Sequence, residues 1–418
     1  IYTLSLHDAL PICDKCGTEF SVREPLTTCS KCGGLLEVNY DLTAMKAGIR
    51  EISGDKKYPS MWRYRQFFPE VEEKNIVTLG EGCTPLVKSV HLAKKLGIEN
   101  LYFKNDTLMP TGSFKDRGFS LAVSYAKELG VKRGFTYSSG NAGSSFAAYS
   151  SRGQFNALVL VEYTANETKR AMIQLYGMKT AILNYDNFEQ ISNMLEQAVK
   201  KLGMYQFVNF INPIRHEAMK TYAYEITETL GYAPDAMFHP VGTGGGIWGA
   251  WKGYNELEQL GFIEKPPKMF GVQPAATAHF KIAFDKGLKI AGAFGDCTKT
   301  IAQSIASDSP IQGGARVLEA IYDSGGAAMA VEDDDILEAM RDLAREGIAA
   351  EPSSASTVAA FKQAYNNGLI KSNETVICVI TGSALKQPSA IYMAAGDSKI
   401  HVKADVNELT ALITELGI

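Results

Sequence analysis

The sequence predicts an α/β fold of mostly parallel sheets, preceded by a small metal-binding segment. Two observations predict it. From about residue 100 onward, short apolar runs typical of buried strands alternate with amphipathic helical patterns, as in sheets covered by helices on both faces. Near the N-terminus, four cysteines form two Cys-x-x-Cys pairs. The length of 418 residues allows two or three domains.

The composition is that of an ordinary globular protein, with 45% hydrophobic and 21% charged residues. A formal net charge of −4 argues against a nucleic-acid surface covering the molecule, and no apolar run approaches the ~18 residues of a membrane-spanning helix. We therefore expect neither nucleic acid nor a membrane as a partner. Of the seven cysteines, four are clustered, which favours a metal site in a reducing cytoplasm over disulfides.

Residues 1–12 lack the basic start and long apolar core of a secretory signal, and they show no clear helical or strand period. We interpret them as a non-native leader, such as a cloning or sequence-assembly remnant, and leave them out of the fold prediction. The alternative is a short ordered arm.

The two cysteine pairs, Cys13 with Cys16 and Cys29 with Cys32, are separated by a twelve-residue gap, and each is followed by glycine. This spacing predicts a zinc ribbon over residues 13–40, in which two tight turns bring four thiolates to tetrahedral positions. Four thiolates leave no open coordination position, so the metal should be structural. Disulfides or free thiols are the alternative. The surrounding charges are mixed in sign, which does not favour nucleic-acid binding.

Strand and helix signals alternate through the rest of the chain. After a glycine-rich turn and an extended segment at 78–86, the predicted strands are 101–104, 134–137, 157–161, 179–183, 236–241, 269–272 and 376–380, and the amphipathic helices include 188–201 and 334–346. In parallel sheets, ligands bind at the carboxyl ends of the strands. Three polar or glycine-rich loops follow strands here, and a lysine-containing turn opens a helix.

Lys115 lies in that turn, Thr111-Gly112-Ser113-Phe114-Lys115-Asp116-Arg117-Gly118. Most lysines are exposed solubilising groups, but the glycines of this turn let other groups approach the backbone closely. A lysine amine that is desolvated or near another cation loses its proton readily and can attack a carbonyl to form a Schiff base. Asp116 and Arg117 can pair with each other and fix the turn. We interpret Lys115 as the candidate nucleophile.

The three loops after strands offer complementary groups. Gly242-Thr243-Gly244-Gly245-Gly246 opens a helix, so its backbone N–H groups and the helix dipole suit a phosphate, with a tight packing turn as the alternative. Ser138-Ser139-Gly140-Asn141 offers two hydroxyls and an amide to a carboxylate and a phenolic oxygen. The hydroxyl of Thr381 can hydrogen-bond a ring nitrogen without supplying charge. For these two loops the alternative is a helix cap.

Together, the amine, the phosphate cradle, the amide and the hydroxyl provide what is needed to hold pyridoxal phosphate. Over roughly residues 76–395 the sequence resembles the fold-type-II pyridoxal-phosphate enzymes, and most closely the threonine synthase family, some members of which also carry an N-terminal ribbon. The resemblance is carried by residues 110–118, by 80–85 with an unusual Cys83, and by the late motifs 351–355 and 381–386.

The resemblance implies two mostly parallel-sheet domains with the active site between them. Residues 41–120 and 207–418 would form a large cofactor-binding domain, and residues 121–206 a smaller α/β domain that carries the serine–asparagine loop. We expect a homodimer, because dimers are the commonest soluble oligomers.

Carried over position by position, the resemblance implies that Lys115 bonds to the cofactor and later moves protons. Residues 242–246 would hold the cofactor phosphate, Asn141 would contact the ring hydroxyl oxygen, and Thr381 the pyridine nitrogen. Binding of the substrate would fall to Ser138 and Ser139 at its carboxylate, and to Lys104, Asn209 and Arg215 at its phosphate.

The implied reaction converts O-phosphohomoserine and water into threonine and phosphate, with γ-elimination of phosphate followed by addition of water at the β carbon. The cofactor ring would act as the electron sink. Two positions near the expected substrate contacts depart from the family pattern, Ala142 in place of threonine and Ala218-Met219 in place of Gly-Gln. A β-replacement or β-elimination on phosphoserine, serine or threonine, as in cysteate synthase-like or dehydratase-like enzymes, therefore stays open. So does a zinc-ribbon binding protein with an inactive enzyme domain.

Overall fold

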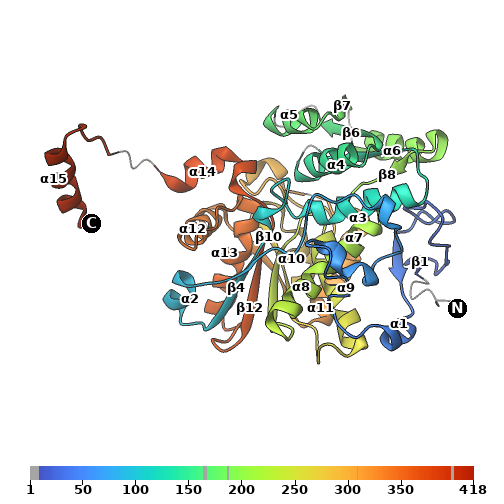
Figure 1. Ribbon diagram of the computed structural model, residues 1–418, viewed down its shortest axis with the longest axis horizontal. Helices are drawn as coiled ribbons and strands as arrows, with labels where there is room; N and C mark the ends of the chain where they lie inside the picture. Colours follow the sequence, from blue (N-terminus) through green and yellow to red (C-terminus); the bar gives the residue numbers. More distant parts are fainter. Residues whose placement is uncertain (1–8, 139, 163–166, 186–187, 308, 397–399) are drawn as a thin grey trace.

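The computed structural model describes residues 9–138, 140–162, 167–185, 188–307, 309–396 and 400–418. The chain forms a two-stranded, a four-stranded and a six-stranded sheet with helices packed around the two larger ones (Figure 1). Within the described ranges, no helix has both the length and the apolar character needed to cross a membrane.

The N-terminal ribbon is a hairpin of β1 (Leu10–Cys13) and β2 (Leu36–Asn39). The two strands are antiparallel, with Leu10 opposite Asn39 and Cys13 opposite Leu36. The ribbon therefore begins at Leu10, and leaving residues 10–12 out of the fold was wrong. Pairing with a partner strand more than twenty residues away orders this segment, and a local period does not reveal such pairing. Residues 1–8 lie outside the described ranges.

The six-stranded sheet contains most of the buried strands. Its order is β11 (Ala327–Val331), β10 (Lys268–Pro274), β9 (Ala236–Pro240), β12 (Thr375–Ile380), β4 (Asn100–Asn105) and β3 (Leu86–Lys88). All neighbours are parallel except β3, which runs antiparallel to β4 at the edge. The four strands predicted in this sheet are confirmed. The sequence did not predict β11, an alanine-rich run with a weak strand signal, or the three-residue β3.

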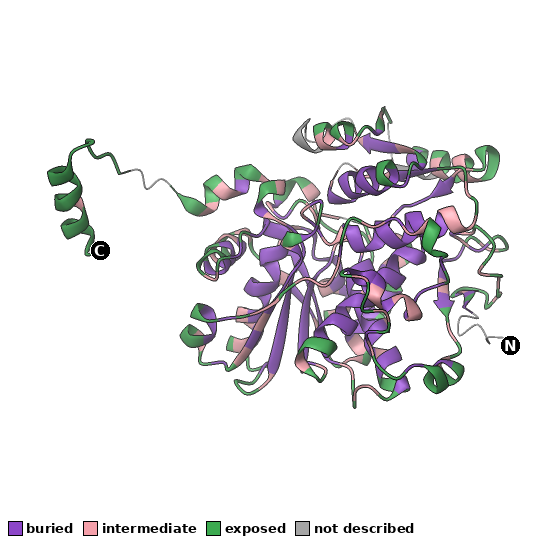
Figure 2. Cartoon of the chain, in the orientation of Figure 1, coloured by how far each residue is buried: buried purple, intermediate pink, exposed green. Residues whose placement is uncertain are grey.

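Helices cover both faces of this sheet. Along β12, Val376 and Cys378 pack in one core cluster, whereas Ile377 and Val379 pack in another, as expected when successive side chains point to opposite faces. One cluster includes α12 (Asp333–Arg345) and α13 (Pro352–Asn366), and the other includes α9 (Gly245–Leu260) and α11 (Ala315–Asp323). Figure 2 shows the strands between these layers as buried.

The four-stranded sheet is parallel throughout and has the order β7 (Lys179–Leu183), β6 (Asn156–Glu162), β5 (Arg133–Tyr137) and β8 (Tyr205–Gln206). The predicted strands in this region are confirmed, apart from the two-residue β8, which was not predicted. Helix α3 (Lys115–Glu128) leads into this sheet, and it packs against α4 (Asn141–Arg152) and α7 (Ile214–Met219). The domain boundary that we placed between residues 120 and 121 falls inside α3, so one continuous helix joins the two sheets.

The other α-helices of the described residues range from largely buried to largely exposed. They include α1 (Leu42–Gly48), α2 (His91–Leu96), α5 (Glu167–Leu175), α6 (Phe188–Leu202), α8 (Thr221–Leu230), α10 (His279–Asp285), α14 (Pro388–Ala395) and α15 (Val406–Leu416). The helices predicted at 188–201 and 334–346 correspond to α6 and α12. Helix α15 has no buried residue and lies away from the other elements in Figure 1.

Candidate active site

The lysine turn and the threonine loop are joined by backbone hydrogen bonds. Phe114 N donates to Thr381 O over 2.8 Å, and Ser383 N donates to Gly112 O over 2.9 Å. These bonds hold the start of α3 against the carboxyl end of β12. Lys115, the first residue of α3, therefore lies beside the loop from which Thr381 comes.

Asp116 closes the lysine turn. Its carboxylate accepts hydrogen bonds from Thr111 N (2.7 Å), Thr111 Oγ1 (2.6 Å) and Ser145 Oγ (2.6 Å). Burial raises the pKa of Asp116 to about 6, although these hydrogen bonds oppose the rise. The predicted pairing of Asp116 with Arg117 is wrong, because consecutive helical side chains point to different sides. Arg117 points instead into a separate buried cluster.

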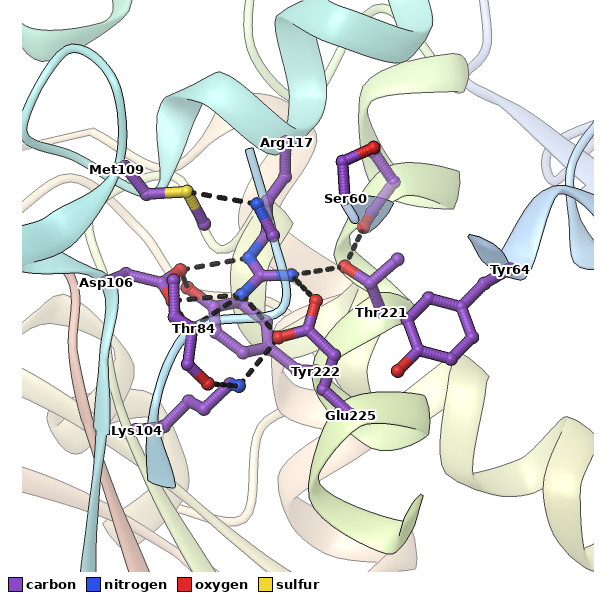
Figure 3. Close-up of polar contacts among 12 residues, drawn as sticks. Ser60, Tyr64, Thr84, Lys104, Asp106, Met109, Arg117, Thr221, Tyr222 and Glu225 are labelled. Carbon is purple, nitrogen blue, oxygen red and sulfur yellow. Dashed lines mark hydrogen bonds and ion pairs between the residues drawn. The ribbon is translucent and has the colours of Figure 1, made fainter. Parts of the chain in front are cut away.

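That cluster is centred on the Arg117 guanidinium (Figure 3). Arg117 donates to both carboxylate oxygens of Asp106 at 2.9 Å and forms an ion pair with Glu225 on α8. Glu225 also accepts from Lys104 Nζ at 2.6 Å, and the same ammonium donates to Thr84 O. The structure thus engages Lys104 in a buried ion cluster, and we leave it out of the proposed substrate-phosphate contacts.

Lys115 has a different environment. Its side chain is half-buried, and among the described residues its ammonium has neither a hydrogen bond nor an ion pair. Nζ lies 3.9 Å from the centre of the Phe114 ring. Burial, aided by the charge of Arg215 and opposed by that of Glu351, lowers the pKa of Lys115 to about 7. A substantial fraction of this amine is therefore neutral and nucleophilic near pH 7.

Arg215 lies on α7 and is 1% exposed. Its Nη1 donates to Phe207 O over 2.9 Å, and its guanidinium lies 4.1 Å from the centre of the Phe119 ring. Within the described part of the chain, its Nε and Nη2 have no hydrogen-bond partner. Burial lowers the pKa of Arg215 to about 9. A buried cation with two unused donors is suited to an anion such as phosphate.

Asn141 and Thr381 meet at the start of α13. Asn141 Nδ2 donates to the two carboxylate oxygens of Glu351 over 3.0 and 3.1 Å, while its Oδ1 has no partner among the described residues. Thr381 Oγ1 lies 3.0 Å from Ser354 Oγ. Because Asn141 follows β5 and Thr381 follows β12, these contacts connect the carboxyl ends of the two sheets, at the predicted position of the active site.

Glu351 is a site residue that the sequence analysis did not assign. In the sequence it stands out only as part of the motif at 351–355, since a single glutamate before a helix has no distinctive pattern. Ser304 Oγ also donates to Glu351 over 3.0 Å, and a Cβ at position 382 would lie 2.6 Å from Glu351 Oε1. Gly382 therefore allows this carboxylate to approach the threonine loop.

The glycine loop follows β9 and opens the 16-residue helix α9. Gly244 has a φ of 94°, and a Cβ at this position would lie 2.0 Å from Val317 Cγ2, so only glycine fits. The N–H groups at the start of such a helix have no intrahelical partner and suit a phosphate. Asn209 donates to Thr243 Oγ1 of this loop, which places it at the glycine loop.

The serine loop is described only in part. Ser138 follows β5, and its Oγ accepts a hydrogen bond from Gly140 N over 3.3 Å. Ser139 lies outside the described residues. The loop leads directly into α4, whose first residue is Asn141.

The four ribbon cysteines gather at one point. Their sulfur atoms all lie within 4.8 Å of one another, with 3.5 Å between those of Cys13 and Cys32 and 3.7 Å between those of Cys16 and Cys29. All four are free thiols in this structure, which does not favour the disulfide alternative. Sulfur atoms at the corners of a tetrahedral zinc site are about 3.8 Å apart, given Zn–S bonds of about 2.3 Å.

The fold and the site together define a class of protein, the pyridoxal-phosphate-dependent enzymes. A family model described as pyridoxal-phosphate dependent enzyme matches residues 77–382. Among solved structures, the chain is similar in fold to threonine deaminase isoform 2 from Solanum lycopersicum, with a TM-score of 0.65 and 22% identity over 82% of this chain and 94% of that one. It is also similar to serine racemase from Dictyostelium discoideum, with a TM-score of 0.60 and 25% identity over 72% and 92%.

Relatives with similar sequences identify the family within this class. A threonine synthase from Methanocaldococcus jannaschii is 40% identical over 97% of this chain and 99% of the relative. One from Methanosarcina acetivorans is 36% identical over 91% and 92%. The chain belongs to the threonine synthase family of pyridoxal-phosphate-dependent enzymes, which confirms the resemblance predicted from its loops.

Proposed function

We propose that this enzyme converts O-phosphohomoserine and water into threonine and phosphate. The observation that carries the proposal is Lys115, a half-buried amine with a pKa of about 7 at the junction of the lysine turn and the threonine loop. Similarity to threonine synthases over nearly the whole chain supports this substrate over phosphoserine, serine or threonine.

The residues present fit pyridoxal phosphate. Lys115 Nζ would bond to its aldehyde carbon, the N–H groups of residues 242–246 would hold its phosphate, Asn141 would contact its ring oxygen, and Thr381 its ring nitrogen. Among the described residues the Lys115 amine has no ion pair, and the glycine loop lies at the start of α9; both features suit these roles. When bound, the cofactor supplies an electrophilic carbon and a ring that accepts electrons.

The side chains of this enzyme then bind the substrate and move its protons. Lys115 Nζ, released when the substrate amine replaces it on the cofactor, would move protons at the α and β carbons of the substrate, for which a pKa of about 7 suits it. Arg215 uses Nε and Nη2, which have no hydrogen-bond partner among the described residues, to bind the substrate phosphate and to stabilise the charge that develops as phosphate leaves. Ser138 and Ser139 bind the substrate carboxylate. Asn209 supports the glycine loop through Thr243 and contributes to phosphate binding there.

The test supplies cofactor-loaded enzyme with O-phosphohomoserine or O-phosphoserine and measures phosphate release and the amino-acid product. Threonine and phosphate should form together from O-phosphohomoserine. Lys115→Ala should abolish both products, whereas Lys127→Ala, on the same helix, should keep them. If O-phosphoserine alone reacts, the enzyme is a β-eliminating or β-replacing relative. If neither substrate reacts and borohydride fixes no cofactor to Lys115, the domain is inactive.

We further propose that Cys13, Cys16, Cys29 and Cys32 hold one structural zinc ion, and that the enzyme works as a homodimer in the cytoplasm. The spacing of the sulfur atoms supports the first inference. Free thiols suit a reducing compartment. Light scattering of the full chain should give twice the chain mass of 45.5 kDa, and a monomer mass would refute the dimer.

A further inference from the structure

The ribbon packs against the helix that begins at the glycine loop. Glu37, on strand β2, accepts a hydrogen bond from Trp248 Nε1 over 2.8 Å and forms an ion pair with Lys252 Nζ at 2.7 Å. Both partners lie on α9, and Trp248 comes two residues after Gly246, the last residue of the loop. A carboxylate of the ribbon therefore contacts the first and second turns of α9.

A second connection runs through α11. Arg316 donates from Nε to Asp14 Oδ2 over 2.7 Å, and Asp14 follows directly after the first cysteine of the ribbon. Arg316 Nη1 also lies 3.2 Å from Glu37 Oε2. The next residue, Val317, lies directly against Gly244. A Cβ built on Gly244 would be 2.0 Å from Val317 Cγ2. One turn of α11 thus contacts both the first cysteine turn and the glycine loop.

The same network reaches the residues proposed to bind substrate phosphate. Lys252 also forms an ion pair with Glu217, which lies on α7 two residues after Arg215. His216, between them, lies 3.2 Å from the position that a Cβ at Gly245 would occupy. The ribbon is therefore connected through one lysine to the helix that carries Arg215.

These ion pairs are shielded from water. The side chains of Glu37, Lys252 and Arg316 are 13%, 11% and 5% exposed, and Glu217 is fully buried. Burial alone would raise the pKa of Glu37, but the positive charges of Lys252 and Arg316 lower it to about 2. Charges paired in such surroundings interact strongly. Without the charge of Glu37, Lys252 would keep only Glu217, and Arg316 only Asp14, as ion-pair partners among the described residues.

The phosphate-binding groups of the glycine loop are backbone N–H groups, which bind well only when their positions are fixed before the ligand arrives. An isolated two-stranded hairpin is marginally stable, and small metal-binding units generally need their metal to fold. Losing the metal would therefore release Asp14 and Glu37 from their positions, and the starts of α9 and α11 would lose the contacts that hold them.

We propose that the metal-loaded ribbon holds the glycine loop in its phosphate-binding position, so that metal binding and pyridoxal phosphate binding reinforce each other. The proposal rests on the proposed function, because it takes residues 242–246 as the phosphate site. Coupling between two binding sites is reciprocal, so the cofactor strengthens metal binding by the same factor by which the metal strengthens cofactor binding.

The test measures the Kd of pyridoxal phosphate for the full chain, with zinc bound and after chelation, in the wild type and in Glu37→Gln. Glu37→Gln keeps the shape of the side chain and removes its charge. Either chelation or this substitution should raise the Kd about tenfold, as expected for one lost hydrogen bond to a charged group. Chelation of Glu37→Gln should add little, because both changes break the same connection.

Arg23→Gln is the matched control. Arg23 also joins the ribbon to the body of the enzyme, through an exposed ion pair with Glu70 and a second pair with Glu128 at the end of α3, and neither partner lies on α9 or α11. The Kd of pyridoxal phosphate for Arg23→Gln should stay within about twofold of the wild-type value, because these pairs do not contact the helices that begin at or pack against the glycine loop. Trp248→Phe keeps an aromatic ring and removes one hydrogen bond to Glu37, so a smaller increase in Kd is expected even if Glu37→Gln folds poorly.

Zinc release provides a second readout that does not use enzyme activity. Pyridoxal phosphate should slow the transfer of zinc to a chelator in the wild type and should have less effect in Glu37→Gln. An unchanged Kd after chelation, or in both Glu37→Gln and Trp248→Phe, would overturn the coupling. If borohydride fixes the cofactor to Lys115 in the same samples, the proposed function stands and only the coupling fails. If borohydride fixes no cofactor to Lys115, the proposed function fails.

Discussion

Lys115 shows how the surroundings of one residue set its chemistry. An exposed lysine has a pKa near 10.4 and is almost fully protonated at neutral pH. Here burial and the positive charge of Arg215, partly opposed by Glu351, together lower that pKa to about 7. Below about pH 7 the amine is protonated and cannot attack a carbonyl, whereas above that pH it is neutral.

The pH dependence of cofactor attachment follows from this pKa. The rate at which cofactor-free enzyme binds pyridoxal phosphate covalently should rise about tenfold per pH unit below pH 7 and level off above it. Glu351→Gln removes the charge that favours the protonated amine, so its midpoint should move to lower pH. Stopped-flow absorbance across a pH series measures both curves. A wild-type midpoint near 10 would show that Lys115 is not desolvated.

Arg215 carries a second prediction at the scale of one residue. Arg215→Gln should lower kcat/KM for O-phosphohomoserine about 100-fold or more, because two hydrogen bonds to a charged phosphate, worth about 1.5–3 kcal/mol each, are lost. The same variant should raise the midpoint pH of cofactor attachment, since Arg215 lowers the pKa of Lys115. Steady-state kinetics with Arg23→Gln as the control measures the first effect. An unchanged kcat/KM would assign the substrate phosphate to other groups.

At the scale of elements, the start of α3 is held from two sides. Asp116 binds back to the turn that precedes the helix, while Arg117 binds Asp106 from η3 (Asp106–Leu108) and Glu225 from α8. Lys104 from β4 completes the second group through Glu225. Residues from α3, η3, α8 and β4 therefore form one buried ion cluster, and Lys115 takes its position from the two residues that follow it.

Removing one charge from this group should be costly. Asp106 accepts hydrogen bonds from Arg117, Thr84 and Tyr222, so Asp106→Ala leaves the buried Arg117 cation with only one of its two carboxylate partners. The free energy of unfolding should fall by about 3–5 kcal/mol. The urea concentration at half-unfolding measures the change. Lys56→Gln, which breaks an exposed pair with Glu51, is the control and should leave that midpoint unchanged. A small effect of Asp106→Ala would mean that water or rearrangement replaces the lost carboxylate.

At the scale of the whole molecule, contacts between side chains join the ribbon and the two larger sheets. The ribbon contacts α9 and α11 through Glu37 and Arg316, and the two sheets meet where Asn141 contacts Glu351. The site therefore depends on three parts of the chain that lie far apart in the sequence.

The metal content tests the ribbon directly. Purified full-length enzyme should contain about one zinc ion per chain, because four thiolates form one closed tetrahedral site. Cys16→Ser should reduce that content strongly, while Cys378→Ser, a buried cysteine in β12, should keep it. Metal analysis by mass spectrometry distinguishes the two variants. Equal zinc content in wild type and Cys16→Ser would place the metal elsewhere.

The sequence by itself determined the features that depend on neighbouring residues. The apolar runs predicted most strands, the cysteine spacing predicted the ribbon, and the lysine turn and glycine loop marked the candidate site. These signals are local, because strand periodicity, turn residues and metal-ligand spacing are set within a few positions.

Only the tertiary structure decided which of these groups meet. Arg117 and Glu225 are 108 residues apart, Asn141 and Glu351 are 210 apart, and Glu37 and Trp248 are 211 apart. Such contacts place Lys104 in a buried ion cluster and Glu351 at the site, and they connect the ribbon to the glycine loop. The physical reason is that burial and pairing of charges depend on where the folded chain brings distant segments together, and no local pattern records that.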